Sequence, residues 1–442
     1  MKNKNIILNE IFNSAIDSKT KGILNLNKIK IKNITKQKWN ILNEDIQFPI
    51  LTINESKFNK NIFSMKRYTD SNKVLLAPHS KTSMSPQLLS RIDKLGCWGF
   101  TVANNQQLSV LLQMGIKKII LANLITNESN MYNFFELVKK YNKTSDVYIC
   151  VDSKFGVNLL KKISVKYQFN INIKILIEVG LKNSRSGIRN IKSLKSLVNS
   201  INKLPMNFTL SGVLFYEGAS KTNNYLSSIN NVKKSIAFAI SSFDFLIQNN
   251  FIKDNEYILS GGGSEFFDLV VDAFNNYKST KKVKFVIRPG SYIAYGDGYY
   301  TSALNKIDNR KKIIIKNKIV KASSLFKPAL ELWSFVISQQ DKGKAVLNFG
   351  KRDVSFDLGL PIPLAIYRNR KLFKKIDNTK NIKIYKLNDQ HAFIKFNHKN
   401  NLKVGDLLKF GVSHPCITID SWNTLYMINN KNVITAALKP FF

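Results

Sequence analysis

A lysine that follows a short apolar run is the first candidate for chemistry in this sequence. Residues 74–77 are apolar, and Pro78, His79, Ser80 and Lys81 come next. If the run forms a buried strand, Lys81 stands just past its end and faces a pocket. A lysine placed there can pair with an anion, which is the commoner role of a lone lysine, or it can form a Schiff base with a carbonyl cofactor.

Two glycine-rich segments could hold a phosphate. One contains Gly262 and Gly263 before Ser264, and the other contains Gly290 and Ser291 within residues 288–292. Backbone N–H groups can approach an anion closely where no Cβ intrudes. A phosphate site near a Schiff-base lysine suits a phosphorylated aldehyde, and pyridoxal phosphate (PLP) is the cofactor of that kind.

A histidine and a cysteine near the C-terminus form a candidate metal site. His414 and Cys416 are separated by one residue, so in an extended segment both side chains point to the same side. Imidazole and thiolate together favour zinc over magnesium or manganese. Two half-buried residues of these types are more often structural, so a structural role stays open. His79 and His391 are possible further ligands or acid–base groups, whereas His398 is typical of a surface turn.

The elements that must position these residues are eight short apolar runs, each following a helix-like stretch. They cover residues 74–77, 99–102, 119–122, 147–151, 173–177, 212–215, 257–259 and 285–287. Continuous apolar runs of this length are typical of parallel strands buried on both faces. Eight of them alternating with helices predict a (β/α)8 barrel.

Polar or glycine-rich residues follow nearly every one of these runs. They are His79, Lys81, Asn104, Asn123, Asp152, Glu178, Tyr216, the glycines at 261–263 and residues 288–292. Polar residues end buried strands in many proteins, but in barrels of this type the chemistry lies at the carboxyl ends of the strands. We therefore expect these side chains to surround one site.

The sequence pattern changes after the eighth run. Short strand-like segments separated by turn signals occupy residues 313–315, 332–337, 345–347, 382–387, 392–396, 407–410 and 425–428. This pattern is typical of a mostly antiparallel β-domain. We therefore predict a polar N-terminal segment (1–45) that packs on the barrel or the β-domain, a barrel (46–305) and a β-domain with the metal-binding segment (306–442).

The formal charge of the 442-residue chain, +39, raises the possibility of nucleic-acid binding. The excess is almost all lysine, spread evenly among asparagine and isoleucine, and A/T-rich codons encode all three residue types. A specific nucleic-acid function is therefore not expected, and strongly salt-dependent DNA binding would reveal one.

Cysteines are few, and no long apolar segment is present. Cys97, Cys150 and Cys416 provide no disulfide framework. The apolar stretch near the N-terminus is too short for a signal-peptide core, and no run approaches the length of a membrane span. These features predict a cytoplasmic protein.

Several motifs carry a family resemblance from about residue 45 to the end of the chain. They are APHSKTSMSPQ, GCWGFTVAN and KIILAN (within 77–123), IEVG and SRSGIR (within 177–189), GVLFYEG (212–218), SGGGS (260–264), IRPGSY (287–292), FGKRDVSFDLGLPIP (349–363) and SHPCITID (413–420). In this order they resemble the fold-type III PLP enzymes of the D-threonine aldolase and D-serine dehydratase group. Within that group they most resemble bacterial proteins described as amino acid deaminases.

The resemblance implies an alanine-racemase-like barrel with a β-domain, a homodimer, Lys81 as the Schiff-base lysine, and a divalent metal on His414 and Cys416. Two positions depart from the pattern. Relatives often have a histidine at the position of Ala219, which leaves the acid–base assignment open. The aldolase branch has an aspartate at the position of Cys416, so the cysteine favours the zinc-dependent dehydratases.

The expected reaction is β-elimination from a D-3-hydroxy amino acid such as D-serine, giving pyruvate and ammonia. Lys81, His79 and Tyr216 are the candidate catalytic residues. The candidate cofactor-binding residues are Lys81, Arg185, Tyr216, Gly262, Gly263, Gly290, Ser291 and Tyr292, with Arg189 as the alternative to Arg185. Two other functions stay open: retro-aldol cleavage of D-threonine-like substrates, and a non-catalytic PLP-binding role.

Overall fold

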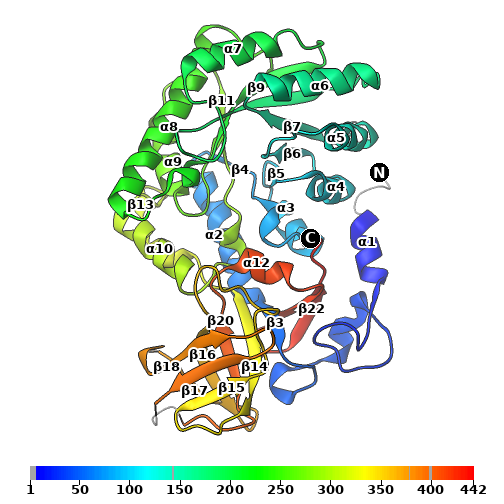
Figure 1. Ribbon diagram of the computed structural model, residues 1–442, viewed down its shortest axis with the longest axis vertical. Coiled ribbons are helices and arrows are strands. Elements are labelled where there is room, and N and C mark those ends of the chain that lie inside the picture. The colour runs from blue at the N-terminus through cyan, green and yellow to red at the C-terminus, as the bar shows by residue number, and fades with distance from the viewer. Residues whose placement is uncertain (1–5, 142–143, 378, 398–400) are drawn as a thin grey trace.

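A computed structural model describes residues 6–141, 144–377, 379–397 and 401–442. Its larger part is a barrel of eight parallel strands, seen in the upper half of Figure 1. The strands are β4 (Leu75–Leu76), β5 (Phe100–Val102), β6 (Lys118–Leu121), β7 (Asp146–Val151), β8 (Ile173–Val179), β9 (Phe208–Phe215), β10 (Tyr257–Gly261) and β11 (Val283–Ile287). The predicted (β/α)8 barrel is confirmed.

The barrel closes between its first two strands. Backbone N–H groups of Trp98 and Thr101 donate to the carbonyl oxygens of Leu76 and Pro78, both at 2.9 Å. Apolar side chains, at least one from nearly every strand, fill the interior: Ala77, Ile120, Ala122, Tyr148, Leu176, Leu214, Ile258 and Val286. The barrel is therefore a packed core, and only its ends are available for a site.

Helices follow the strands and cover the outside of the barrel. They are α2 (Glu55–Ser71), α3 (Pro86–Asp93), α4 (Asn105–Gln113), α5 (Glu128–Tyr141), α6 (Lys154–Lys166), α7 (Ile191–Ile201), α8 (Tyr225–Gln248), α9 (Phe267–Asn276) and α10 (Tyr299–Arg310). Local sequence sets several of their starts. Asn54, Asn104, Ser153, Asn190 and Asn224 each cap a helix by accepting a hydrogen bond from a backbone N–H of its first turn.

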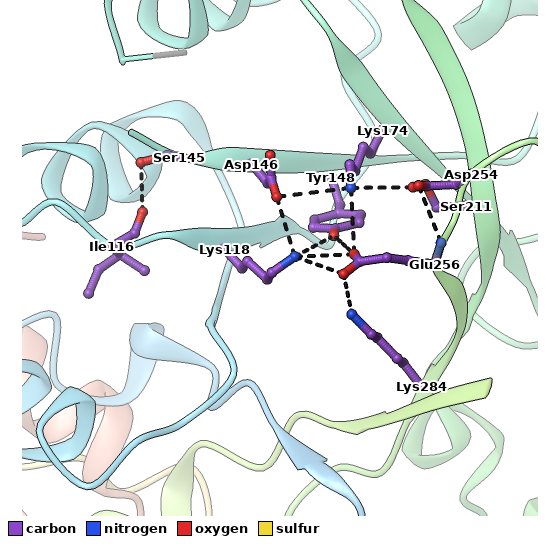
Figure 2. A network of polar contacts seen from close by, with 10 residues as sticks. All are labelled: Ile116, Lys118, Ser145, Asp146, Tyr148, Lys174, Ser211, Asp254, Glu256 and Lys284. Carbon is purple, nitrogen blue, oxygen red and sulfur yellow. Dashed lines mark hydrogen bonds and ion pairs between the residues drawn. The ribbon is translucent and has the colours of Figure 1, made fainter. Parts of the chain in front are cut away.

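The amino ends of the barrel strands carry a network of charged side chains (Figure 2). Glu256 accepts hydrogen bonds from Tyr148 at 2.5 Å, from Lys118 at 3.0 Å, and from Lys284. Burial alone would raise the pKa of Glu256, but the hydrogen bonds from Lys284, Tyr148 and Lys118 outweigh it and bring the pKa to about 2. This network closes the floor of the barrel and leaves the opposite end for chemistry.

The second part of the chain is a mostly antiparallel sheet, in the lower half of Figure 1. Its strands are β3 (Ile50–Asn54), β14 (Leu330–Ser338), β15 (Lys344–Leu347), β16 (Ile362–Arg368), β17 (Lys371–Lys375), β18 (Ile382–Leu387), β19 (Ala392–Phe396), β20 (Leu407–Gly411), β21 (Leu425–Ile428) and β22 (Ile434–Leu438). The predicted C-terminal β-domain is confirmed. Residues 314–319 form a separate hairpin of β12 (Ile314–Ile315) and β13 (Lys318–Ile319).

Strand β3 lies within the range that the sequence pattern places in the barrel, but it pairs with β14 and β21 of the other sheet. Its five residues are all buried, so an apolar run alone does not distinguish a barrel strand from a strand of the β-domain. The N-terminal segment contacts both parts of the chain. Helix α1 (Ile6–Asn13) packs on α3 and α4, and the carbonyl oxygen of Lys21 accepts a hydrogen bond from Tyr426 at 2.7 Å.

Candidate active site

A cavity of about 320 Å³ opens at the carboxyl ends of the barrel strands. Short helix α12 (Pro415–Asp420), from the β-domain, lies against the loop that follows β4 and forms one wall; Figure 1 shows it between the two parts of the chain. The lining residues are His79, Lys81, Thr82, Ala103, Ala122, Asn123, Arg185, Leu214, Tyr216, Gly262, Gly263, Ser264, Glu265, Arg288, Gly290, Ser291, Tyr299, Tyr300, Leu358, His414 and Cys416.

Lys81 is held in place by the residues before it. It lies in a short 3₁₀ helix, Ser80–Thr82, whose N-cap is His79, and Nδ1 of His79 accepts a hydrogen bond from the backbone N–H of Lys81 at 3.4 Å. The hydroxyl of Ser80 donates to the carbonyl oxygen of Thr101 at 2.9 Å. Burial lowers the pKa of the Lys81 ammonium, and nearby Arg185 and Arg288 lower it further, against an opposite effect of Cys416.

His79 stays neutral in this setting. Burial lowers the pKa of its imidazole well below the usual range, and the positive charges of Lys81, Arg288 and Arg185 act in the same direction. With Nδ1 accepting from Lys81, His79 is a cap that orients the lysine. It also borders the cavity, as expected for a residue at a strand end, and its role as a metal ligand or acid–base group stays a prediction.

Gly262 and Gly263 line the cavity, but their N–H groups already have an acceptor within the protein. The carboxylate of Glu217 accepts from Gly262 N at 3.0 Å and from Gly263 N at 2.6 Å. Gly262 has φ +86°, a left-handed backbone conformation that favours glycine. The two glycines therefore shape the loop, while Glu217, which is fully buried, takes the hydrogen bonds that the sequence assigned to the cofactor.

Gly290 and Ser291 present a better anion cradle. Their N–H groups converge on one oxygen, the hydroxyl of Ser264, to which they donate at 3.2 and 3.1 Å. A Cβ on Gly290 would lie 2.7 Å from the carbonyl oxygen of His79, which only glycine avoids. Tyr300 adds a hydroxyl to this set of polar groups, because its oxygen lies 2.9 Å from the hydroxyl oxygen of Ser291.

Tyr292, a predicted cofactor-binding residue, is outside the cavity. Its side chain is completely buried, and its hydroxyl has no hydrogen-bond partner among the described residues. Burial raises the pKa of this phenol well above the ordinary value, and the nearby Cys97 and Tyr295 add to the effect. Tyr292 is therefore a core residue, since the 3₁₀ turn Ser291–Ile293 directs it inward.

Of the two candidate arginines, Arg185 lines the cavity and Arg189 does not. The guanidinium of Arg185 lies 5.3 Å from the ring centre of Tyr216 and 3.8 Å from the carboxylate of Glu178. Arg189 instead binds the carbonyl oxygens of Leu181 and Ser184 and holds its own loop. Burial, with Glu217 and Glu265, raises the pKa of Tyr216 to about 12, so its hydroxyl remains protonated.

Arg288 is a cavity residue that the sequence analysis left without a role. It is 8% exposed, one guanidinium nitrogen donates to the carbonyl oxygen of Phe215, and its Nε has no partner among the described residues. An unpaired donor on a buried cation is costly unless a ligand completes it. Its place directly after the eighth strand put it among the residues expected to surround the site, but that position did not indicate its role.

His414 and Cys416 both line the cavity, but the expected extended segment is wrong. His414 is the N-cap of α12, and Cys416 lies in the first turn of that helix behind Pro415. Proline is favoured at the first position of a helix, so the sequence carried this signal. The two side chains still meet, because the cap residue and the first turn share one end of the helix.

The thiol and the imidazole interact with each other. Burial would raise the pKa of Cys416, but hydrogen bonding to His414 and Thr82 and the charge of Lys81 lower it. Burial likewise would lower the pKa of His414, while Cys416 and Asp357 raise it. The described part of the chain contains no group of three or more such side chains suited to a metal, so an ion on His414 and Cys416 would keep positions open.

Most of the other predicted residues lie outside the cavity lining. His391 is exposed in a turn of the β-domain, and His398 lies outside the described residues. Asn104 caps α4, and Asp152 accepts from the N–H of Gly187 at 3.0 Å. Glu178 is buried behind Arg185, and Asn123 borders the cavity.

Within the described residues, no helix combines the length and apolar character needed to cross a membrane.

Comparisons with known proteins agree with this architecture. The model of a putative serine dehydratase domain matches residues 329–428, which include His414 and Cys416. The D-threonine aldolase of Filomicrobium marinum superposes with a TM-score of 0.70 at 16% identity, covering 90% of this chain and 96% of that one. No curated protein sequence matches significantly.

Two further structures share the fold. D-threo-3-hydroxyaspartate dehydratase from a Delftia species superposes with a TM-score of 0.68 at 16% identity, covering 91% of this chain and 98% of that one. An alanine racemase from Clostridium difficile gives 0.58 at 13% identity, covering 90% and 100%. The alanine-racemase-like fold and the resemblance to the fold-type III D-threonine aldolase and D-serine dehydratase group are confirmed.

Proposed function

We propose that this chain, a relative of the fold-type III D-threonine aldolases and D-serine dehydratases, is a PLP- and metal-dependent lyase acting on D-3-hydroxy amino acids. D-Serine dehydration to pyruvate and ammonia is the proposed reaction. The observation that carries the proposal is the meeting of Lys81 with His414 and Cys416 in one cavity, although more than 330 residues separate them in sequence.

The residues of the cavity fit PLP. Three groups of the cavity match parts of this cofactor. Lys81, with its lowered pKa, matches the aldehyde, and the N–H groups of Gly290 and Ser291 match the phosphate. The unpaired Nε of buried Arg288 matches the polar ring. We expect Lys81 to bind the cofactor covalently and Gly290, Ser291, Ser264 and Tyr300 to hold its phosphate. When bound, PLP would draw electrons from Cα of the substrate.

The residues also fit a divalent metal. His414 and Cys416 are a nitrogen and a sulfur donor, a set that favours zinc. A cysteine-to-alanine variant of a D-threo-3-hydroxyaspartate dehydratase is described in its metal-free form, so a metal ion is relevant to that protein of the same fold. A metal ion would supply a Lewis acid near the substrate hydroxyl.

The chain's own groups account for proton transfer and orientation. Lys81, with its lowered pKa, is suited to accept the proton from Cα once its amine is free. His79 is neutral and capped onto the Lys81 backbone, so it orients this base. Arg185, stacked on Tyr216 at the cavity mouth, is the candidate partner for the substrate carboxylate. The hydroxyl then leaves with a proton as water, and hydrolysis of the resulting 2-aminoacrylate gives pyruvate and ammonia.

The alternative reaction is retro-aldol cleavage, which the similarity to D-threonine aldolase favours. Elimination requires the Cα–H bond to lie along the π system of the cofactor, whereas cleavage requires Cα–Cβ there. Arg185, the candidate partner of the substrate carboxylate, would therefore determine which of the two bonds is aligned and which reaction follows.

A product assay tests the proposal. Purified protein with PLP and zinc would be incubated separately with D-serine, D-threonine and D-threo-3-hydroxyaspartate, and keto acids, ammonia and glycine would be measured. Keto acid with equal ammonia supports the dehydratase, and glycine with acetaldehyde from D-threonine supports the aldolase. Lys81→Ala is the control. No product from any of the three substrates would overturn the proposed lyase function.

A further inference from the structure

A carboxylate outside the predicted site binds the histidine of that site. Oδ2 of Asp357 lies 2.6 Å from Nδ1 of His414. The His414 side chain is 20% exposed and that of Asp357 is 42% exposed, so the pair lies at the cavity edge where water still reaches the carboxylate. With Nδ1 engaged, Nε2 is the nitrogen left for a metal ion.

The loop that carries Asp357 is fastened to the segment that carries His414. The hydroxyl of Ser355 donates to the carbonyl oxygen of His414 at 3.0 Å, and the backbone N–H of Ser355 donates to the hydroxyl of Thr418 at 3.1 Å. On the other side of Asp357, the carbonyl oxygen of Gly359 accepts from the hydroxyl of Ser413 at 2.5 Å. These contacts fix the position of Asp357 relative to the imidazole from both directions.

Such anchoring distinguishes this pair from an ordinary surface ion pair. A partly exposed ion pair contributes little to stability, and many such pairs contribute nothing measurable. A carboxylate that accepts the Nδ1 proton of a metal-binding histidine has a different effect. It fixes the tautomer and the ring orientation and makes the other nitrogen a stronger ligand.

We propose that Asp357 is a positioning residue that presents Nε2 of His414 to the metal ion shared with Cys416. This inference rests on the proposed function, because it requires the metal site of the lyase. Asp357 itself touches neither substrate nor cofactor. Its effect passes through His414, so it should appear in metal affinity while cofactor binding stays constant.

The test compares three variants of the full chain, each loaded with PLP. Asp357→Ala removes the acceptor, Asp357→Asn keeps an oxygen that can accept from Nδ1 but removes the charge, and Asp341→Asn is the matched control. Asp341 is a surface aspartate of the same domain, 75% exposed and away from His414. The dissociation constant for Zn²⁺ is measured by competition with a chromogenic chelator, together with PLP absorbance and melting temperature.

We expect Asp357→Ala to weaken zinc binding by about 10–100-fold, the usual effect of removing such a partner. Asp357→Asn should lose less, and Asp341→Asn should match the parent chain, with PLP absorbance unchanged throughout. If the Asp357 variants bind zinc as tightly as the parent chain, this inference is overturned while the proposed function stands. Failure of the parent chain to bind zinc would overturn the metal site of the proposed function, and this inference with it.

Discussion

The carboxylate of Glu217 accepts a hydrogen bond from the backbone N–H of Gly263 at 2.6 Å and a second from Gly262 at 3.0 Å. Burial raises the pKa of Glu217, while these N–H groups and Arg288 act in the opposite direction. The buried side chain thus serves as the hydrogen-bond acceptor of the glycine loop. The N–H groups that follow the eighth strand donate to the hydroxyl of Ser264 instead, and they are the ones that we propose for a cofactor phosphate.

Removing this acceptor should weaken both the fold and cofactor binding. In Glu217→Ala, two buried N–H donors lose their partner, at about 1–3 kcal/mol each, and the loop before Ser264 loses its shape. We expect the free energy of unfolding to fall by about 2–6 kcal/mol and the PLP dissociation constant to rise. Urea unfolding and fluorescence titration measure the two quantities. Glu136→Ala, on the exposed face of α5, is the control; equal stability of the two variants would contradict the role of Glu217.

Lys81 should be the lysine that carries PLP. Lys81→Ala is expected to abolish the visible absorbance of the bound cofactor, while exposed Lys117→Ala retains it. The reason is placement, because Lys81 lies in the cavity on a capped turn beside the Gly290 and Ser291 cradle. Borohydride reduction followed by peptide mapping locates the adduct, and a pyridoxyl group on another lysine would exclude this assignment.

Metal removal should separate cofactor binding from turnover. Chelation is expected to stop pyruvate formation from D-serine and to leave the visible absorbance nearly unchanged, because PLP is held by residues other than His414 and Cys416. Zinc added back should restore the rate. Cys416→Asp should shift metal preference toward harder ions such as manganese and raise aldolase activity relative to dehydration. Full activity in protein shown to be metal-free by elemental analysis would refute the zinc role.

Asp297 should make stability depend on pH. It lies where the barrel meets the β-domain, with its backbone N–H donating to Val412 at 2.8 Å. Burial, and secondarily the charge of Glu331, raises the pKa of its carboxyl to about 6, although Lys57 and Lys409 oppose the shift. In an unfolded chain, the pKa of an aspartate is about 4.

The native chain therefore holds this proton more tightly than the unfolded chain. The contribution of Asp297 to the free energy of unfolding should fall by about 3 kcal/mol between pH 4 and 6 and stay low above that range. Asp297→Asn should accordingly be more stable than the parent chain at pH 7–8, with the difference shrinking toward pH 5. Urea unfolding at several pH values, with exposed Asp377→Asn as reference, measures it. A difference that is constant with pH would indicate an unshifted carboxyl.

Local sequence predicted the elements well where one physical rule was enough. The eight apolar runs became the eight barrel strands because a strand buried on both faces must be apolar throughout. Several of the residues that follow them, among them Lys81, Tyr216 and Arg288, line one cavity because parallel strands end at the same side. The same rule could not place β3, since a strand of the β-domain can be just as buried.

What the sequence alone determined is the order of the strands, the candidate residues at their ends, and the pairing of His414 with Cys416. Tertiary structure decided where each of these groups points. It directed Tyr292 into the core, turned the Gly262 and Gly263 N–H groups toward Glu217, and placed Asp357 against His414. Side-chain direction depends on contacts between segments distant in the chain, and a local sequence pattern does not specify those contacts.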